Sequence, residues 1–161
     1  MKKILSILLL CVMCLASCGG AETKTEYKTD VSVNDISAKI IEVSKNETLI
    51  QAEADWIVLN TPFDPSLCDE YSIYISTTSS SDMFGVFKAS TEENADIIAD
   101  EAKNYLEDLK NNWMSEYNQD EFPKVENATV KKCGLYITFF IFEDEIRESA
   151  ENEFVSMLEV K

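Results

Sequence analysis

The fold is decided by the run LYITFFIF, which extends from Leu135 to Phe142. Apolar side chains occupy both sets of alternate positions in this run, whereas a strand with one solvated face alternates apolar and polar residues. The run therefore predicts a central strand that is covered on both faces. Residues 128–132 precede it across the dipeptide Cys133-Gly134, and this arrangement predicts a hairpin between the two segments.

A second hairpin is predicted earlier in the chain. Residues 71–77 alternate large apolar and smaller polar side chains, which is typical of a strand. The small polar residues 78–81 form the predicted turn, and residues 83–89 form the second strand. Gly85 within that strand indicates a bulge or close packing against another backbone.

The longest predicted helix begins at the capping box Ser90-Thr91-Glu92-Glu93, with Ser90 as the N-cap. Apolar and aromatic residues then recur every three or four positions and form one stripe. Its members are Ile98, Ala102, Tyr105, Leu109, Trp113 and Tyr117. A helix that continues to Tyr117 has about 27 residues and a length of ~40 Å.

Two further helices are predicted at the ends of the domain. Ser32 is the expected N-cap of the first, and Asp144 is the expected N-cap of the last. The residues expected to face inward are Val33, Ile36, Ile40 and Val43 in the first helix, and Ile146, Ala150, Phe154 and Leu158 in the last. Residues 49–59 are apolar without a clear period, and a short helix around Trp56 is expected there.

These elements predict one α+β domain over residues 31–161. Its two antiparallel hairpins form a roughly four-stranded sheet, packed against the long helix and the C-terminal helix, with an N-terminal helix in addition. Strands grouped as hairpins, rather than alternating singly with helices, favour this class over a parallel α/β fold.

The N-terminus has the composition of a secretory signal peptide, predicted over residues 1–17. Met1-Lys2-Lys3 is followed by an apolar run of twelve residues, from Ile4 to Leu15. As a helix this run would span ~18 Å, which is too short for a hydrocarbon layer of ~30 Å.

The end of this segment, Leu15-Ala16-Ser17-Cys18, resembles the bacterial lipobox. The resemblance implies cleavage before Cys18, a lipid on its sulfur, and a protein held at the extracytoplasmic face of the cell membrane. Cys11 and Cys14 follow large side chains and fit the motif badly. The alternative is a soluble secreted protein that is cleaved near Ala16.

The lipidated Cys18 and a flexible tether are predicted over residues 18–30. Gly19–Asp30 reads GGAETKTEYKTD and has no apolar period. A flexible chain of this length spans ~19 Å, which exceeds the ~8 Å screening length at physiological salt. We therefore expect the domain to stand clear of an anionic membrane surface.

Composition excludes several classes of function. The chain has 161 residues, 30 acidic and 14 basic side chains, no histidine and a formal net charge of −16. Binding to the nucleic-acid backbone requires lysine and arginine in excess, so it is excluded. The lack of histidine excludes Ser-His-Asp triads, Cys-His pairs and histidine-liganded zinc. We expect no metal and no cofactor, and the charge favours a cationic envelope partner.

Several short segments together resemble one family of Gram-positive lipoproteins, the domain of unknown function 4358 family. The resemblance covers residues 31–158 and implies a location and a fold, but no catalytic residues. The segments that carry it are VSVNDI at 31–36, FDP at 63–65, DEY at 69–71, FGVFK at 84–88, VENATV at 125–130 and GLY at 134–136.

Cys68 and Cys133 are the cysteines that remain in the predicted mature chain once Cys18 is lipidated. Outside the cytosol a disulfide between them is allowed, and two separate buried thiols are the alternative. A nucleophilic role is not expected, because the chain has no histidine and its acidic character raises a thiol's pKa.

Other residues that could take part in catalysis or metal binding also have a purely structural explanation. Ser79-Ser80-Ser81 lacks the Gly-x-Ser-x-Gly and Ser-x-x-Lys motifs and is expected to be a turn. Acidic residues gather at two predicted helix starts, where they offset the helix dipole; a weak cation site or a catalytic carboxylate pair are the alternatives. They are Glu92, Glu93 and Asp96, and Glu143, Asp144, Glu145, Glu148, Glu151 and Glu153.

The sequence thus favours a lipid-anchored extracytoplasmic protein whose domain binds a partner or supports an envelope assembly without catalysis. The first alternative is a carboxylate-based hydrolase of cell-wall glycan, which requires two carboxyl groups in a cleft. The second is an accessory solute-binding domain.

Overall fold

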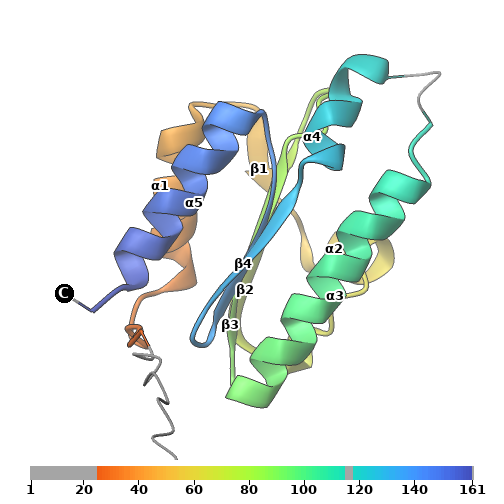
Figure 1. The fold of residues 1–161 in the computed structure, drawn as a ribbon. Coiled ribbons are helices and arrows are strands. Elements are labelled where there is room, and N and C mark those ends of the chain that lie inside the picture. The colour runs from red at the N-terminus through yellow and green to blue at the C-terminus, as the bar shows by residue number, and fades with distance from the viewer. Residues whose placement is uncertain (1–24, 115–117, 161) are drawn as a thin grey trace, which may run out of the picture.

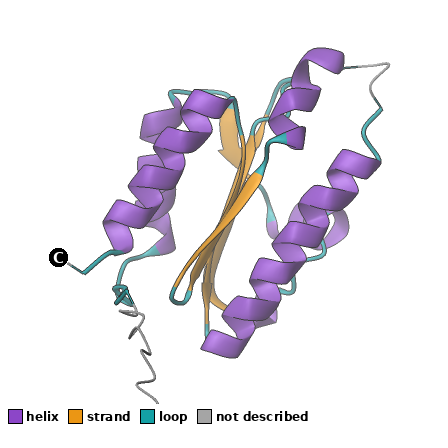
Figure 2. Ribbon diagram, in the orientation of Figure 1, coloured by secondary structure: helices purple, strands orange, loops and turns teal. Residues whose placement is uncertain are grey.

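A five-stranded antiparallel sheet lies between two layers of helices (Figures 1 and 2). The structure, a computed structural model, describes residues 25–114 and 118–160. The predicted signal peptide, Cys18 and the first part of the predicted tether lie outside the described residues. Within the described part, no helix has the length and the apolar composition needed to cross a bilayer.

The sheet has the strand order β1-β2-β3-β5-β4, and every neighbouring pair is antiparallel. Its strands are β1 (Leu49–Gln51), β2 (Cys68–Ser76), β3 (Met83–Ala89), β4 (Thr129–Cys133) and β5 (Tyr136–Ile141). Both predicted hairpins are present, as β2–β3 and β4–β5. The prediction of four strands is wrong, because β1 adds a fifth at the edge. With three residues, β1 is too short to show a strand period in the sequence.

Two helices cover one face of the sheet and three cover the other (Figure 1). The first face carries α1 (Val33–Ser44) and α5 (Asp144–Leu158); the second carries α2 (Ala54–Asn60), α3 (Glu92–Asn111) and α4 (Phe122–Glu126). Two short 3-10 helices, η1 (Pro65–Leu67) and η2 (Gln119–Glu121), lie in the connections. The α+β class predicted from the sequence agrees with this arrangement.

Strand β5 is buried along its whole length, as its two-sided apolar pattern predicts. Ile137, Phe139 and Ile141 belong to the core beneath α3, whereas Tyr136 and Phe140 belong to the core beneath α1 and α5. Thr138 is the polar exception, and its hydroxyl donates a hydrogen bond of 2.7 Å to the Gly85 carbonyl oxygen. One strand therefore supplies side chains to both cores.

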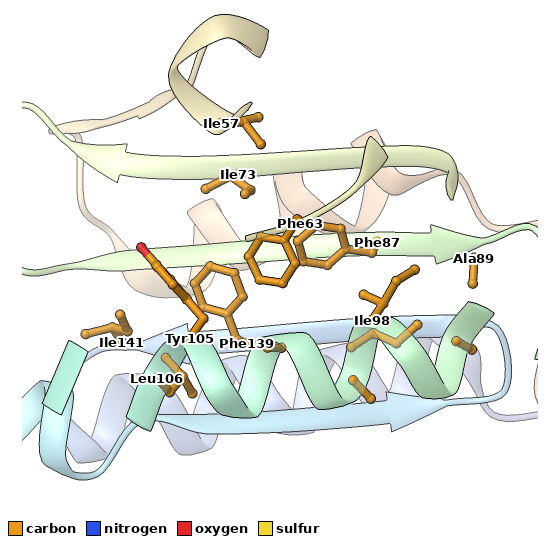
Figure 3. Close-up of a cluster of buried hydrophobic side chains, with 14 of the residues drawn as sticks. Ile57, Phe63, Ile73, Phe87, Ala89, Ile98, Tyr105, Leu106, Phe139 and Ile141 are labelled. Atoms are coloured by element: carbon orange, nitrogen blue, oxygen red, sulfur yellow. The ribbon is translucent and has the colours of Figure 1, made fainter. Parts of the chain in front are cut away.

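Aromatic rings fill the core beneath α3 (Figure 3). Phe63 stacks on Phe139 with ring centroids 5.7 Å apart, and Tyr105 meets the same ring edge-on at 5.7 Å. Gly85 lies on β3 directly opposite Phe139. A Cβ atom at Gly85 would lie 2.4 Å from Phe139 Cε1, so the glycine makes room for this ring rather than for another backbone.

One predicted helix start is confirmed, and two differ from the prediction. Ser32 caps α1 as expected, because its hydroxyl accepts a hydrogen bond from the Asp35 N–H. The N-cap of α3 is Thr91 rather than Ser90, whose hydroxyl donates to the Leu67 carbonyl oxygen instead. Asp144 is the first residue of α5 rather than its cap.

Helix α3 has 20 residues and is shorter than predicted. It ends at Asn111, where the Asn112 side chain donates a hydrogen bond to the Asp108 carbonyl oxygen. Asparagine competes for backbone groups in this way and favours helix ends over helix interiors. Tyr117, the last member of the predicted stripe, lies outside the described residues.

Part of the predicted tether belongs to the folded domain. Tyr27 forms an antiparallel bridge with Glu159. The Lys28 N–H donates a hydrogen bond of 2.7 Å to the Leu158 carbonyl oxygen, and the Val160 N–H donates one of 3.3 Å to Glu26. We call residues 26–28 the strap. The domain therefore begins before Val31, where the sequence pattern placed its start.

Candidate functional site

The two cysteines that sequence analysis singled out lie on opposite faces of the sheet, and both are free thiols. Cys68 packs against the core beneath α3, whereas Cys133 is buried in the core beneath α1 and α5. Burial, and then the charges of Glu101, Asp64 and Asp69, raise the pKa of Cys68 to about 12. Burial also raises the pKa of Cys133. Both environments disfavour the thiolate that a nucleophile needs.

The two acidic groups at the helix starts are mostly exposed. Glu92, Glu93 and Asp96 are all exposed on the first turns of α3. At the start of α5, Asp144 forms an ion pair with Arg147 at 2.5 Å, and the half-buried Glu151 lies 2.9 Å from Lys131. These carboxylates thus have the structural surroundings expected of helix starts.

One carboxyl group, Glu101 on α3, has a raised pKa among the residues that the structure describes. Burial is the main cause; a hydrogen bond from the Asp64 N–H opposes it, and the charge of Asp64 adds to it. The Oε2 atom of Glu101 is buried without a hydrogen-bond partner within the described residues. Asp64 has a lowered pKa, because the Ser66 N–H and hydroxyl donate hydrogen bonds to its carboxylate. The two carboxyl groups therefore differ in their preferred charge.

The most connected polar site surrounds Lys124 on α4, which is only 7% exposed. Its Nζ atom lies 2.9 Å from Asp82 Oδ1 and 3.0 Å from Glu121 Oε2. The same ammonium group donates a hydrogen bond of 3.2 Å to the Ser80 hydroxyl. We call Lys124, Asp82, Glu121, Ser80 and Ser81 the lysine cluster.

Several connections meet at the lysine cluster. The 77–82 connection between β2 and β3 supplies the serines and Asp82, and η2 supplies Glu121. The Ser81 N–H donates a hydrogen bond of 2.6 Å to the Glu121 carboxylate. From the connection after α1, Asn46 Nδ2 donates one of 2.6 Å to Asp82. The cluster therefore fastens these connections together at one end of the sheet.

A lysine beside a serine hydroxyl can act as a general base only when the amine is neutral. Here burial lowers the pKa of Lys124, but hydrogen bonds to Asp82 and Glu121 and the charges of both outweigh it, so the net shift is upward. The ammonium form is stabilised, and Lys124 cannot take a proton from Ser80 at neutral pH. The cluster is suited to holding the fold together rather than to nucleophilic chemistry.

Sequence analysis treated Ser79-Ser80-Ser81 as a turn and did not identify its partner. Lys124 is 44 residues away from Ser80 in the sequence. No local motif links the two positions, and only the path of the chain through β3, α3 and η2 brings them together. A lone lysine in an acidic stretch was the one available hint.

We expect the lysine cluster to make stability depend on pH in acid. Burial raises the pKa of Glu121, but hydrogen bonds from the Ser81 N–H, Lys124 and the Ser81 hydroxyl outweigh it and lower the pKa to about 2 from an ordinary 4.5. A carboxyl whose pKa is lower in the folded state stabilises the fold above its unfolded pKa. This contribution is therefore complete above pH 4.5 and is lost as the pH falls toward 2.

Urea unfolding of the wild type and Glu121→Gln between pH 7 and pH 2.5 measures this contribution. The wild type should lose free energy of unfolding more steeply than the variant below pH 4.5. Glu126→Gln, which changes an exposed glutamate at the end of α4, is the control. Parallel pH profiles for wild type and Glu121→Gln would contradict the assignment.

The whole lysine cluster lies within a region that matches a known family. The family described as Domain of unknown function (DUF4358) matches residues 61–142, about half of the chain. The chain belongs to the DUF4358 family. The resemblance predicted from the sequence is confirmed at this level, although the match is shorter than residues 31–158. No curated protein and no solved structure matches the chain.

The residues that match the DUF4358 family form most of the sheet and the long helix that covers one face of it. The match extends from just before Phe63 to Phe142 and so contains β2 to β5, α3 and α4. All five members of the lysine cluster lie within it. Helices α1 and α5, β1 and the strap lie outside the DUF4358 match and complete the second core.

Proposed function

We propose that this DUF4358 protein is an extracytoplasmic lipoprotein, anchored through Cys18, whose domain binds a cationic partner in the cell envelope without catalysis. The observation that carries the proposal is the lipobox Leu15-Ala16-Ser17-Cys18 after an apolar run of signal-peptide length. The signal peptide is residues 1–17 in this proposal. Two acyl chains on the mature N-terminus would hold it firmly, because each buried methylene contributes ~0.8 kcal/mol.

The charge distribution supports a cationic partner. Most basic side chains of the described domain already form ion pairs: Lys39, Lys88, Lys103, Lys124, Lys131, Lys132 and Arg147. The remaining surface charge is therefore strongly negative. Such a surface accelerates association with basic proteins and makes the interaction sensitive to salt.

A non-catalytic role is supported by the state of the reactive groups. The pKa values of Cys68 and Cys133 are raised, which disfavours their thiolates, and Lys124 is held as an ammonium ion. The two cysteines as nucleophiles and the lysine as a base would each need the opposite charge state to take part in catalysis.

One observation favours a second candidate, a carboxylate-based hydrolase of cell-wall glycan. Glu101 and Asp64 have pKa values shifted in opposite directions, which is the pattern of an acid and its partner carboxylate. Release of sugar from purified cell wall, abolished by Glu101→Gln, would establish the hydrolase and overturn the non-catalytic proposal.

Anchoring is tested by growing the host with an alkyne-bearing fatty acid and measuring its incorporation into the protein. We expect Cys18→Ala to abolish incorporation and the N-terminal mass shift, because the acceptor sulfur is removed. Cys14→Ala is the matched control, since it removes a nearby thiol that fits the lipobox badly, and it should incorporate the label normally. Unchanged incorporation in Cys18→Ala would contradict the anchor.

Partner binding is tested by affinity capture from detergent-solubilised envelope. We expect the wild-type protein to capture basic envelope proteins, and the yield to fall as salt rises from about 0.05 to 0.5 M, because screening shortens the reach of the acidic surface. Capture that does not respond to salt would contradict electrostatic recruitment.

A further inference from the structure

The strap ties the N-terminal side of the domain to its C-terminal helix. Two backbone hydrogen bonds join the strap to the end of the chain: the Lys28 N–H donates to the Leu158 carbonyl oxygen, and the Val160 N–H donates to the Glu26 carbonyl oxygen. In addition, the Lys28 ammonium donates a hydrogen bond of 2.8 Å to the Met157 carbonyl oxygen. The half-buried Tyr27 packs against the core that contains Cys133. A Cβ atom at Gly134 would lie 3.3 Å from Tyr27 Cβ, so Tyr27 rests on the β4–β5 turn.

The strap and the lysine cluster lie at opposite ends of the sheet. Gly134 connects β4 to β5 at the end where Tyr136 pairs with Lys88. The 77–82 connection leads into Met83, which pairs with Ile141 at the other end of β5. Figure 1 shows the strap near the β4–β5 turn, and α4 at the far end of the domain. We call these the strap end and the cluster end.

The length of chain between Cys18 and the strap limits how the domain can lie on a membrane. Thr25 follows Cys18 by seven positions, and even a fully extended chain over these seven steps reaches only ~24 Å. The nine residues of β2 extend ~30 Å along the sheet at ~3.3 Å per residue. If all of residues 18–30 were free, the reach would be ~42 Å and every orientation would be open.

We infer that the strap fixes the domain on its anchor, with the strap end facing the lipid surface and the cluster end facing away. This inference rests on the proposed anchor at Cys18. With the strap docked, the free chain of ~24 Å is shorter than the ~30 Å sheet, so the domain cannot turn over and stand with its cluster end on the membrane that holds the anchor. The 77–82 connection, α4 and the connection after α1 then form the face that is presented to other envelope components.

The strap end has side chains that suit a position near a lipid surface without insertion. A groove of about 930 Å³ there is lined by Tyr27, Leu135 and Val160, and Val160 is 53% exposed. Glu26, Glu92 and Asp96 line the same groove, and Asp96 forms an ion pair with Lys132. The carboxylates repel anionic headgroups, which disfavours insertion of this end into the membrane.

Docking of the strap is tested by thiol labelling, because Cys133 is 2% exposed and lies next to Tyr27. In the mature protein in detergent, maleimide labelling is followed at each cysteine by peptide mass spectrometry. Tyr27→Ala should speed labelling of Cys133 and leave Cys68, on the opposite face of the sheet, unchanged. Tyr27→Phe keeps the ring and should keep the protection. Equal protection of Cys133 in the wild type and in Tyr27→Ala would contradict the inference that the strap is docked on the domain.

Faster labelling at both cysteines would show that Tyr27→Ala loosens the whole fold. In that case Gly134→Ala, which presses on Tyr27 and strains the turn at φ +60°, replaces it, and labelling must again rise at Cys133 alone. Labelling that still rises equally at Cys68 would overturn the strap as a separate unit.

Orientation is tested with the lipidated protein in vesicles of phosphatidylglycerol and phosphatidylethanolamine that carry a headgroup-linked energy acceptor. A donor dye is attached through an azide-bearing residue at Glu159, on the strap end, or at Ser79, on the cluster end. Energy transfer should be higher from position 159, and Tyr27→Ala should reduce the difference. Equal or reversed transfer in wild type would overturn the orientation. Failure of the protein to float with the vesicles would contradict the proposed anchoring through Cys18. The thiol-labelling test would still show whether the strap is docked.

Discussion

Lys124→Met is expected to lower the free energy of unfolding by about 3–5 kcal/mol, because removing one partner leaves buried charges without compensation. Asp82 and Glu121 would lose the ammonium group that lies about 3 Å from each carboxylate. Methionine fills a similar volume, so the effect reports charge rather than a cavity. The loss is expected to shrink in acid, where protonation of Glu121 removes one of the two charges that Lys124 compensates.

Urea unfolding followed by far-UV circular dichroism measures this effect at pH 7 and at pH 3. Lys103→Met is the matched control, because Lys103 forms an exposed ion pair with Asp100 on α3. Such exposed pairs contribute about 0–1 kcal/mol. Equal effects of the two substitutions at pH 7 would show that the lysine cluster does not stabilise the fold.

Phe139→Ala is expected to destabilise the protein by about 3–5 kcal/mol, because it leaves a cavity among rings that have no room to collapse. Phe139 is fully buried and packs against Phe63, Phe87 and Tyr105. Ile97→Ala, at an exposed position of α3, is the control and should have a small effect.

Gly85 provides a sharper form of the same test. Gly85→Ala alone should cost about 1–3 kcal/mol, because the added methyl group overlaps the Phe139 ring. Combined with Phe139→Ala, the methyl group loses its closest overlap and keeps only the 2.9 Å contact with Phe87 Cε2, so the double variant should lose less than the two single variants together. Strict additivity in urea unfolding would contradict the contact between Gly85 and Phe139.

The central strand was predictable because burial on both faces leaves a continuous apolar run, and the run at β5 is long enough to be unambiguous. The hairpins were predictable because turn residues, polar ones at 77–82 and Gly134 between β4 and β5, separate strands that are adjacent in the sequence. Strand β1 was not predictable, because its three residues pair with β2, from which α2 and η1 separate them in the chain. Its pairing depends on tertiary contacts rather than on a local period.

The candidate sites that are local in the sequence were likewise predictable, and those that the fold assembles were not. The lipobox at Cys18 is a local motif of four residues, so the sequence is sufficient to propose it. The lysine cluster joins positions up to 44 residues apart, and the serine turn on its own predicts no such partner. The strap was missed because the polar composition of residues 26–28 hides the backbone pairing that Tyr27 makes.

The bridge between Tyr27 and Glu159 brings the two ends of the domain together. A short peptide linker could join these two ends. New termini could then be opened in the exposed part of the 77–82 connection, giving a circular permutant with the same two cores. In the native arrangement, a reporter fused to the C-terminus would lie on the same side of the domain as the strap. A reporter inserted at Ser79 would lie at the opposite end of the sheet, and the proposed anchor predicts that antibodies and proteases added to whole cells could reach it there.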